Sequence, residues 1–183
     1  MSPAALILID IQRGFDDPRW GARNNPGAEA AAGRLLARWR AAGAPLVHIR
    51  HLSTTPGSPL GPGPGNAFKP EVTPLPGETI FEKSVNSAFI GTPLEAHLHG
   101  LGATKLVVCG LTTPHCVSTT CRMAANLGFG VILAHDACAA FDTSADYSWS
   151  NAPAMQAEAI HASAVSHLHA EFVTARAADE IAA

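Results

Sequence analysis

Short apolar runs alternate along this chain with longer, alanine-rich segments whose apolar residues recur every three or four positions. The apolar runs predict strands at 6–9, 46–49, 79–81, 106–109, 131–133 and 171–174. The longer segments predict helices over 28–42, 93–99, 115–127 and 153–169. Because the runs are apolar at consecutive positions, we expect strands that are buried on both faces, as in a parallel sheet.

This regular alternation of strands and helices predicts an α/β fold. We expect three αβα layers, with a doubly wound, Rossmann-like parallel sheet of six strands in the middle. Ligands of such sheets bind beyond the carboxyl ends of the strands. Reactive side chains just past a predicted strand are therefore the candidates for chemistry.

Residues 56–77 interrupt the alternation, since this stretch of 22 residues holds seven of the 14 prolines and five of the 16 glycines. It is too long for an ordinary connection and too rich in breakers for regular structure. The 55 residues before it are too few for a stable α/β unit of their own. We therefore predict a single domain over 1–183, with 56–77 as an active-site loop.

Composition narrows the function further. The 183 residues are 47% hydrophobic and 15% charged, with a formal net charge of −3. The chain has no run of basic residues of the kind that binds nucleic acid. It also has no apolar stretch long enough to cross a bilayer. The N-terminus lacks the pattern of a secretory signal. We expect a soluble, cytoplasmic protein that acts on a small molecule.

The four cysteines are Cys109, Cys116, Cys121 and Cys138. They lie close together in the sequence and form no C-x-x-C pair, so neither a disulfide framework nor a zinc knuckle is expected. We interpret them as reduced thiols, mostly small core residues, with room for one reactive group.

Three side chains with complementary chemistry are expected at one edge of the sheet. Asp10 ends the first strand, Lys83 follows the third, and Cys116 follows the fourth. Pro114 suits a first helical turn and Thr113 can cap it, so Cys116 is expected at a helix N-terminus that favours a thiolate. Taken singly, each residue is more often a solvated or core side chain than a catalytic one. Their conjunction favours a site.

Three segments resemble the isochorismatase-like cysteine hydrolases, which include nicotinamidases and N-carbamoylsarcosine amidases. They are 6–12 with Phe15, 82–84 with 87–89, and 110–120. The segments follow the family's order, and the intervening elements agree along nearly the whole chain. The segment around Cys116 is the most specific of the three.

The resemblance implies a catalytic triad of Asp10, Lys83 and Cys116, acting on a C–N bond of a small amide, ureide or lactam through a thioester. It also implies a cis peptide bond between Leu111 and Thr112. The backbone amides of Thr112 and Cys116 would then form an oxyanion hole.

This chain differs from two groups within the family. Nicotinamidases of the family carry an Asp-x-His metal motif after the second strand, but this chain has Arg50-His51-Leu52-Ser53, without that aspartate. We therefore expect neither a metal nor another cofactor. The isochorismatases proper lack the nucleophilic cysteine, whereas Cys116 is present here.

The substrate pocket is harder to predict. Its candidates are Gln12, Phe15, Trp20, His51, Phe68, Asn86, Phe89, His115 and Phe141. Phe15 and Phe89 have the better case because they lie in matched segments; for His51 a structural role is an equal alternative. Segments 16–20 and 66–70 resemble streptothricin-hydrolase-like proteins.

Other functions stay open at this point. The chain could be a nicotinamidase, a catalytically idle scaffold, or a thiol redox sensor that pairs Cys116 with Cys121. The redox hypothesis is geometrically awkward because a disulfide needs close Cβ atoms. We also expect a homo-oligomer, a dimer or tetramer, since such relatives commonly assemble.

Overall fold

The computed structural model describes residues 4–183, so the first three residues of the predicted domain and N-terminus lie outside the described part. Its strands are β1 (Ala5–Ile9), β2 (Leu46–His51), β3 (Thr79–Lys83), β4 (Lys105–Leu111), β5 (Gly130–Ala139) and β6 (Thr174–Arg176). Its α-helices are α1 (Ala28–Ala42), α2 (Leu94–Gly100), α3 (Ser118–Asn126) and α4 (Ala157–Ser166).

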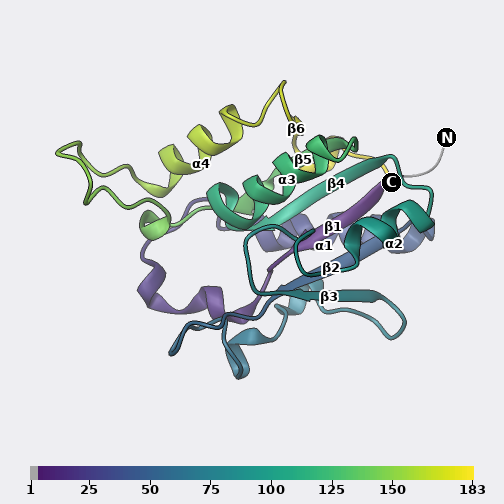
Figure 1. Ribbon diagram of the computed structural model, residues 1–183, viewed down its shortest axis with the longest axis horizontal. Coiled ribbons are helices and arrows are strands. Elements are labelled where there is room, and N and C mark those ends of the chain that lie inside the picture. Colours follow the sequence, from purple (N-terminus) through teal and green to yellow (C-terminus); the bar gives the residue numbers. More distant parts are fainter. Residues whose placement is uncertain (1–3) are drawn as a thin grey trace.

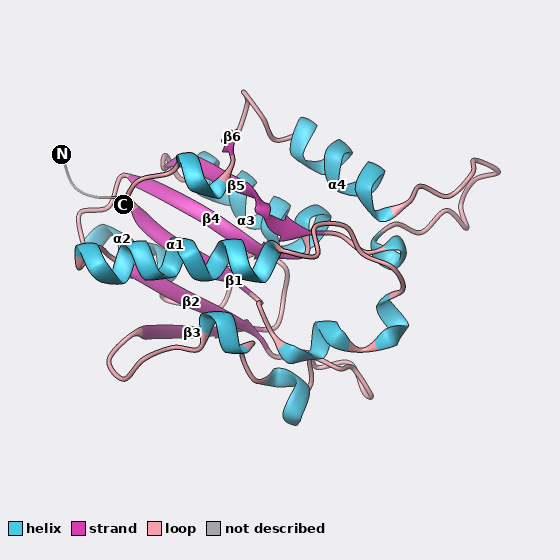
Figure 2. Cartoon of the chain, turned by 180° about the vertical axis from the view of Figure 1, so that it is seen from behind, coloured by secondary structure: helices cyan, strands magenta, loops and turns pink. Residues whose placement is uncertain are grey.

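The strands form one parallel sheet in the order β3-β2-β1-β4-β5-β6, which confirms the predicted fold. In Figure 1, α2 and α3 lie in front of the sheet and α1 behind it, and Figure 2 shows α1 from its own side. Every residue of β1 is buried between these layers. Trp39 of α1 is also fully buried, and its indole N–H donates to the Ala4 carbonyl at 2.8 Å.

The order of the strands reverses direction between β1 and β4, the point at which ligands bind in open α/β sheets. Gly110 lies near the end of β4 with a φ of 133°, and a Cβ there would be 2.0 Å from the Ile9 carbonyl oxygen. Only glycine therefore lets β4 pass so close to the end of β1.

Three predicted elements differ in extent. β5 continues for ten residues instead of three, so Cys138 lies within a strand rather than after it. The predicted helix 153–169 is shorter, since the chain stays irregular up to Gln156 and the Ala157 amide donates to the Asp142 carboxylate at 2.7 Å. The predicted strand at 171–174 is displaced to β6, because turns around Ala170, which has a φ of 70°, fill the gap.

The proline- and glycine-rich loop 56–77 contains two short 3-10 turns and is anchored at its base. The Gln12 side-chain amide donates to the carbonyls of His51 and Asn66, each at 3.0 Å. Lys69 forms ion pairs with Asp16 at 2.6 Å and with Glu29 at 2.8 Å. Side chains from outside the loop therefore hold its shape. Among residues 4–183, no helix has the length and apolar character needed to cross a membrane.

Candidate active site

Asp10, Lys83 and Cys116 come together beyond the ends of β1, β3 and β4. The Lys83 ammonium lies 2.6 Å from Asp10 Oδ2 and 3.3 Å from Cys116 Sγ. The side chains of Asp10 and Lys83 are completely buried, and Cys116 is 8% exposed. The fold thus joins an acid, a cation and a thiol that are far apart in the sequence.

Asp10 occupies an unusual backbone conformation directly after β1. Its φ is 52°, in the left-handed region that few residues other than glycine adopt, and its amide donates to the Ile49 carbonyl at 3.0 Å. Strained residues of this kind persist only where the surrounding structure holds them, and they concentrate at functional sites.

The two carboxylate oxygens of Asp10 have different surroundings. Oδ2 accepts the hydrogen bond from Lys83, while Oδ1 is buried with no hydrogen-bond partner among the described residues. Burial raises the pKa of Asp10, and the attraction of Lys83 opposes this rise without cancelling it. Such a carboxylate has the capacity to accept a proton from a neighbour.

The Cys116 thiol is that neighbour, and it is protonated at rest. Burial raises its pKa to about 12, the charge of Asp10 adds to the rise, and Lys83 opposes it. The helix N-terminus was expected to favour a thiolate, but burial is the larger influence on this thiol. Because burial outweighs the favourable groups, a base must take the proton.

The turn that carries Cys116 also differs from the expected helix start. Residues Thr113–Val117 form a π-helical turn before α3 begins at Ser118. Thr113 is not the capping residue; the cap position is Thr112, without a side-chain capping bond, and Thr113 Oγ1 lies 2.8 Å from His161 Nδ1. The wider turn is typical of functional sites in helices.

The peptide bond between Leu111 and Thr112 is cis. Thr112 and Cys116, whose amides the family resemblance assigns to the oxyanion hole, both line the cavity described below. Thr112 Oγ1 also lies 3.0 Å from Nδ1 of His115, another residue of the lining.

His51, the last residue of β2, is a fourth member of the cluster. Its Nδ1 lies 3.0 Å from the Lys83 ammonium, which therefore has three acceptors for its three protons: Asp10, Cys116 and His51. Burial and the charge of Lys83 lower the pKa of His51 to about 4. A neutral ring that accepts at Nδ1 carries its proton on Nε2.

Asp10, His51 and Cys116 also offer donor atoms within 4.8 Å of one another, close enough to hold a metal ion. The Lys83 ammonium forms hydrogen bonds with all three residues. The protein thus supplies its own cation at this point, and a metal ion would have to displace it.

A cavity of about 280 Å³ opens onto the thiol. Its lining consists of Phe15, Trp20, His51, Ser53, Ser58, Leu60, Asn86, Thr112, His115, Cys116, Thr143 and Ser144. Of the predicted pocket residues, the structure thus brings Phe15, Trp20, His51, Asn86 and His115 to the cavity.

Four candidates lie outside this lining, for packing reasons. Gln12 is fully buried, and its amide donates to the carbonyls of His51 at the end of β2 and of Asn66 in the loop 56–77. Phe89 stacks on Phe129 at 6.0 Å between ring centroids. Phe141 supports the ring of Phe15 from behind, at 5.8 Å. Phe68 packs against His48 and Arg50. Gln12 and Phe89 thus lie outside the cavity lining, and their contact with substrate stays a prediction.

Five lining residues were missed by the sequence analysis: Ser53, Ser58, Leu60, Thr143 and Ser144. Ser58 and Leu60 belong to the proline- and glycine-rich stretch, whose composition indicated a loop over a site without indicating which residues face it. Thr143 and Ser144 follow the end of β5, which the short predicted strand placed too early.

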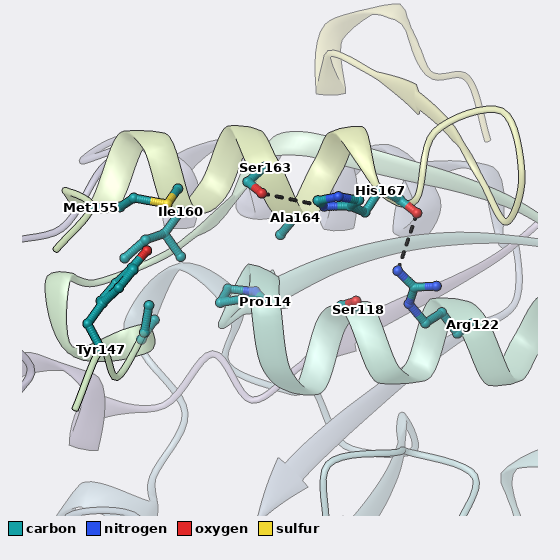
Figure 3. Close-up of a pocket in the computed structure, with 11 residues that line it drawn as sticks. Pro114, Ser118, Arg122, Tyr147, Met155, Ile160, Ser163, Ala164 and His167 are labelled. Carbon is teal, nitrogen blue, oxygen red and sulfur yellow. Dashed lines mark hydrogen bonds between the residues drawn. The ribbon is translucent and has the colours of Figure 1, made fainter. Parts of the chain in front are cut away.

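A second hollow, of about 300 Å³, lies between α3 and α4 and shares Ser144 with the first. In Figure 3, Pro114, Ser118 and Arg122 line one side of it, and Ile160, Ser163 and His167 line the other. Arg122 donates to the His167 carbonyl at 3.3 Å, so this bond joins the two helices across the hollow. None of the triad residues lines it.

The other three cysteines, Cys109, Cys121 and Cys138, are completely buried and free. Burial raises the pKa of each thiol, to about 12 for Cys138. Only Cys116 combines an opening to a cavity with a neighbouring acid and ammonium.

Comparisons with known proteins identify the family of this chain. The protein YrdC of Bacillus subtilis (strain 168), from the isochorismatase family, is 44% identical over 178 residues, which cover 97% of this chain and 93% of YrdC. A streptothricin hydrolase of Streptomyces noursei is 39% identical over 142 residues, 75% of this chain and 50% of that protein. A maleamate amidohydrolase of Pseudomonas putida is 30% identical over 156 residues, 72% of this chain and 70% of that protein.

Among solved structures, a protein of the isochorismatase family from Chromobacterium violaceum has a TM-score of 0.91 and 48% identity, over 97% of this chain and 90% of that one. The N-carbamoylsarcosine amidase of Thermoplasma acidophilum shares the fold, with a TM-score of 0.78 and 22% identity over 99% of each chain. The Isochorismatase domain itself matches residues 4–164. The chain therefore belongs to the isochorismatase family of hydrolases.

Proposed function

We propose that this protein is a cysteine amidohydrolase that cleaves a C–N bond of a small amide, ureide or lactam through a thioester. One observation carries the proposal: Asp10, which keeps one buried oxygen without a hydrogen-bond partner, lies within 4.8 Å of a protonated thiol, and Lys83 contacts both side chains. The relatives named as maleamate amidohydrolase and streptothricin hydrolase support this class of reaction.

In the first half of the reaction, Asp10 takes the proton of the Cys116 thiol as sulfur attacks the carbonyl carbon of the substrate. The C=O π electrons move to oxygen, where the amides of Thr112 and Cys116 would stabilise the negative charge. The intermediate collapses as Asp10 gives its proton to the leaving nitrogen. The C–N bond breaks and an acyl thioester stays on Cys116; ammonia or an amine departs, or, from a lactam, the freed amine remains attached to the acyl group.

In the second half, Asp10 takes a proton from water, and the oxygen of that water attacks the thioester carbonyl. Collapse of this intermediate breaks the C–S bond. The sulfur recovers the proton from Asp10, and a carboxylic acid is released. Asp10 thus serves as base and as acid in each half, a role that its raised pKa suits.

Lys83 balances the negative charge that passes between Asp10 and Cys116, and it touches both residues from one fixed point. His51 acts as a positioning residue, since it accepts the third proton of the ammonium and holds Lys83 between its partners.

A panel of small substrates tests the proposal, with ammonia release measured for amides and ureides and the newly formed amine measured for lactams. Cys116→Ala should reduce turnover to background, because no other thiol reaches the cavity. Cys121→Ala, at a buried thiol outside the cavity, is the matched control and should keep the rate. Iodoacetamide should modify Cys116 faster than the other three cysteines, since they are completely buried.

Undiminished turnover in Cys116→Ala would overturn the mechanism. Equal, slow labelling of all four thiols, with no amide hydrolysed, would favour the idle scaffold. The nicotinamidase alternative is tested with nicotinamide in the same assay, before and after treatment with a chelator.

A further inference from the structure

We infer that the site selects uncharged amides with a flat or apolar acyl group and rejects amides that carry a carboxylate. The inference rests on the proposed function and concerns the part of the substrate that does not react. It is carried by the charge and shape of the cavity wall.

One side of the cavity is an aromatic wall. The rings of Phe15 and Trp20 lie 5.4 Å apart between centroids, and Phe141 backs both of them, at 5.8 and 6.2 Å. The Trp20 indole N–H donates to the Gly14 carbonyl at 2.8 Å, so this N–H is already used within the protein. With Leu60 beside them, these rings offer a surface suited to a flat, apolar group.

The polar side chains of the lining carry no net charge. Ser53, Ser58, Asn86, Thr143 and Ser144 contribute hydroxyl and amide groups, which pair with neutral carbonyl and N–H groups. Burial lowers the pKa of both lining histidines, to about 4 for His51, so their rings are neutral near pH 7. Neither histidine then supplies a cation for an anionic substrate.

The arginines closest in sequence to Phe15 and Trp20 do not line the cavity. Arg19 pairs with Asp17 at 3.1 Å, and Arg23 pairs with Glu29 at 2.7 Å. Arg13 lines a neighbouring hollow, together with Asp17. No arginine or lysine belongs to the lining, as far as residues 4–183 define it.

The Lys83 ammonium is not free to pair with a substrate carboxylate either. All three of its protons have acceptors within the cluster, and its charge is balanced by Asp10. A substrate carboxylate would therefore lose its water without gaining an ion pair. An unpaired buried charge costs more free energy than an unpaired neutral group.

Size limits the substrate as well. A cavity of about 280 Å³ is at the lower end for small-molecule sites, which span roughly 300–1,000 Å³. An amide with one small ring or a short unsaturated chain suits that volume.

The test compares matched amides that differ by one carboxylate: benzamide with 4-carbamoylbenzoate, and crotonamide with fumaramate. Ammonia release by the wild-type protein gives kcat/KM, and calorimetry with Cys116→Ala gives binding without turnover. We expect the neutral member of each pair to be preferred by about 10- to 100-fold in both measurements. Equal or better use of the carboxylated members would overturn the inference.

A gain of charge sharpens the test. Ser58→Arg places a cation in the cavity lining and should shift the preference toward the carboxylated member by about tenfold or more. Thr55→Arg adds the same charge at an exposed position of the chain outside the lining, and it should leave the preference unchanged. An equal shift in both variants would contradict a role for the lining.

The two proposals fail in different ways. Hydrolysis of carboxylated amides alone would overturn the inference and leave the cysteine amidohydrolase standing. Hydrolysis of no amide at all, with tight binding of neutral amides to Cys116→Ala, would overturn the proposed reaction and support the inferred selectivity.

Discussion

Two buried lysine–carboxylate pairs in this protein look alike and behave differently. Lys83 lies 2.6 Å from Asp10 at the carboxyl ends of the strands, and Lys69 of the loop 56–77 lies 2.8 Å from Glu29 of α1. Yet the pKa of Asp10 is raised and that of Glu29 is lowered.

The difference follows from the partners of each carboxylate. Burial raises the pKa of Glu29 as well, but hydrogen bonds from Arg23 and Lys69 more than offset it. Both Glu29 oxygens accept hydrogen bonds, whereas Asp10 leaves Oδ1 without one. A fully bonded carboxylate stabilises the fold, and a buried, half-bonded one is ready to take a proton.

The largest expected effect separates the two pairs by catalysis. Asp10→Asn keeps the shape of the side chain but removes the base, so kcat/KM should fall by about 10²- to 10⁴-fold. Glu29→Gln is the matched change in the other pair, and its folded protein should keep kcat/KM within a few-fold. Ammonia release with a substrate found in the panel measures both. A comparable loss of rate in the two variants would erase the distinction.

The second prediction separates the pairs by stability. Glu29→Gln leaves Lys69 and Arg23 without the carboxylate that both of them bind. Loss of one partner of a buried ion pair is strongly destabilising, and we expect the free energy of unfolding to drop by about 3 kcal/mol. Urea unfolding measures it, with Glu71→Gln, at an exposed glutamate outside any ion pair described here, as control. An unchanged midpoint would show that this pair is not structural.

The third prediction uses pH. Asp10 must be ionised to act as base, so the rate should fall about tenfold per pH unit as the pH drops below its raised pKa. Glu29, with its lowered pKa, stabilises the fold above its ordinary pKa of 4.5 and loses that contribution only as the pH falls through its lower folded value. Activity should therefore be lost at a higher pH than this contribution to stability. Parallel pH profiles of rate and unfolding, with coincident midpoints, would contradict the argument.

The smallest expected effect concerns His51. His51→Ala removes one of the three acceptors of the Lys83 ammonium, and we expect kcat to fall about five- to tenfold because a hydrogen bond to a charged group is lost. A positioning role also predicts that the acidic limb of the pH–rate profile moves, since Lys83 acts on Asp10. His97→Ala, in α2, is the control histidine. A changed KM alone would instead indicate a substrate contact.

Much of this protein follows from the pattern of its residues. Consecutive apolar positions that alternate with helical patterns predicted a six-stranded parallel sheet, because such runs are typical of strands buried on both faces. The same strand ends brought Asp10, Lys83 and Cys116 to one edge. The prediction was weaker where local preference was overridden: β5 runs on for ten residues, and β6 begins three residues later than predicted, after the turn at Ala170.

The substrate pocket shows the limit most clearly. Gln12 and Phe89 lie in the segments that resemble the family. Yet the Gln12 side chain binds the backbone of Asn66 in the loop, and Phe89 stacks on Phe129 in the core. Thr143 and Ser144 carry no sequence pattern of their own and still line the cavity. Which side of a loop faces a ligand depends on contacts between distant segments.

The sequence by itself thus determined the fold, the edge of the sheet that carries the chemistry and the residue types gathered there. Only the tertiary structure decided which Asp10 oxygen lacks a partner, that His51 completes the bonds of Lys83, and that the cavity wall is uncharged. The physical reason is that burial and hydrogen bonding set the proton affinity of a group. In this site the hydrogen bonds join residues that are far apart in the chain, from 30 positions for Cys116 and Asn86 to 73 positions for Asp10 and Lys83.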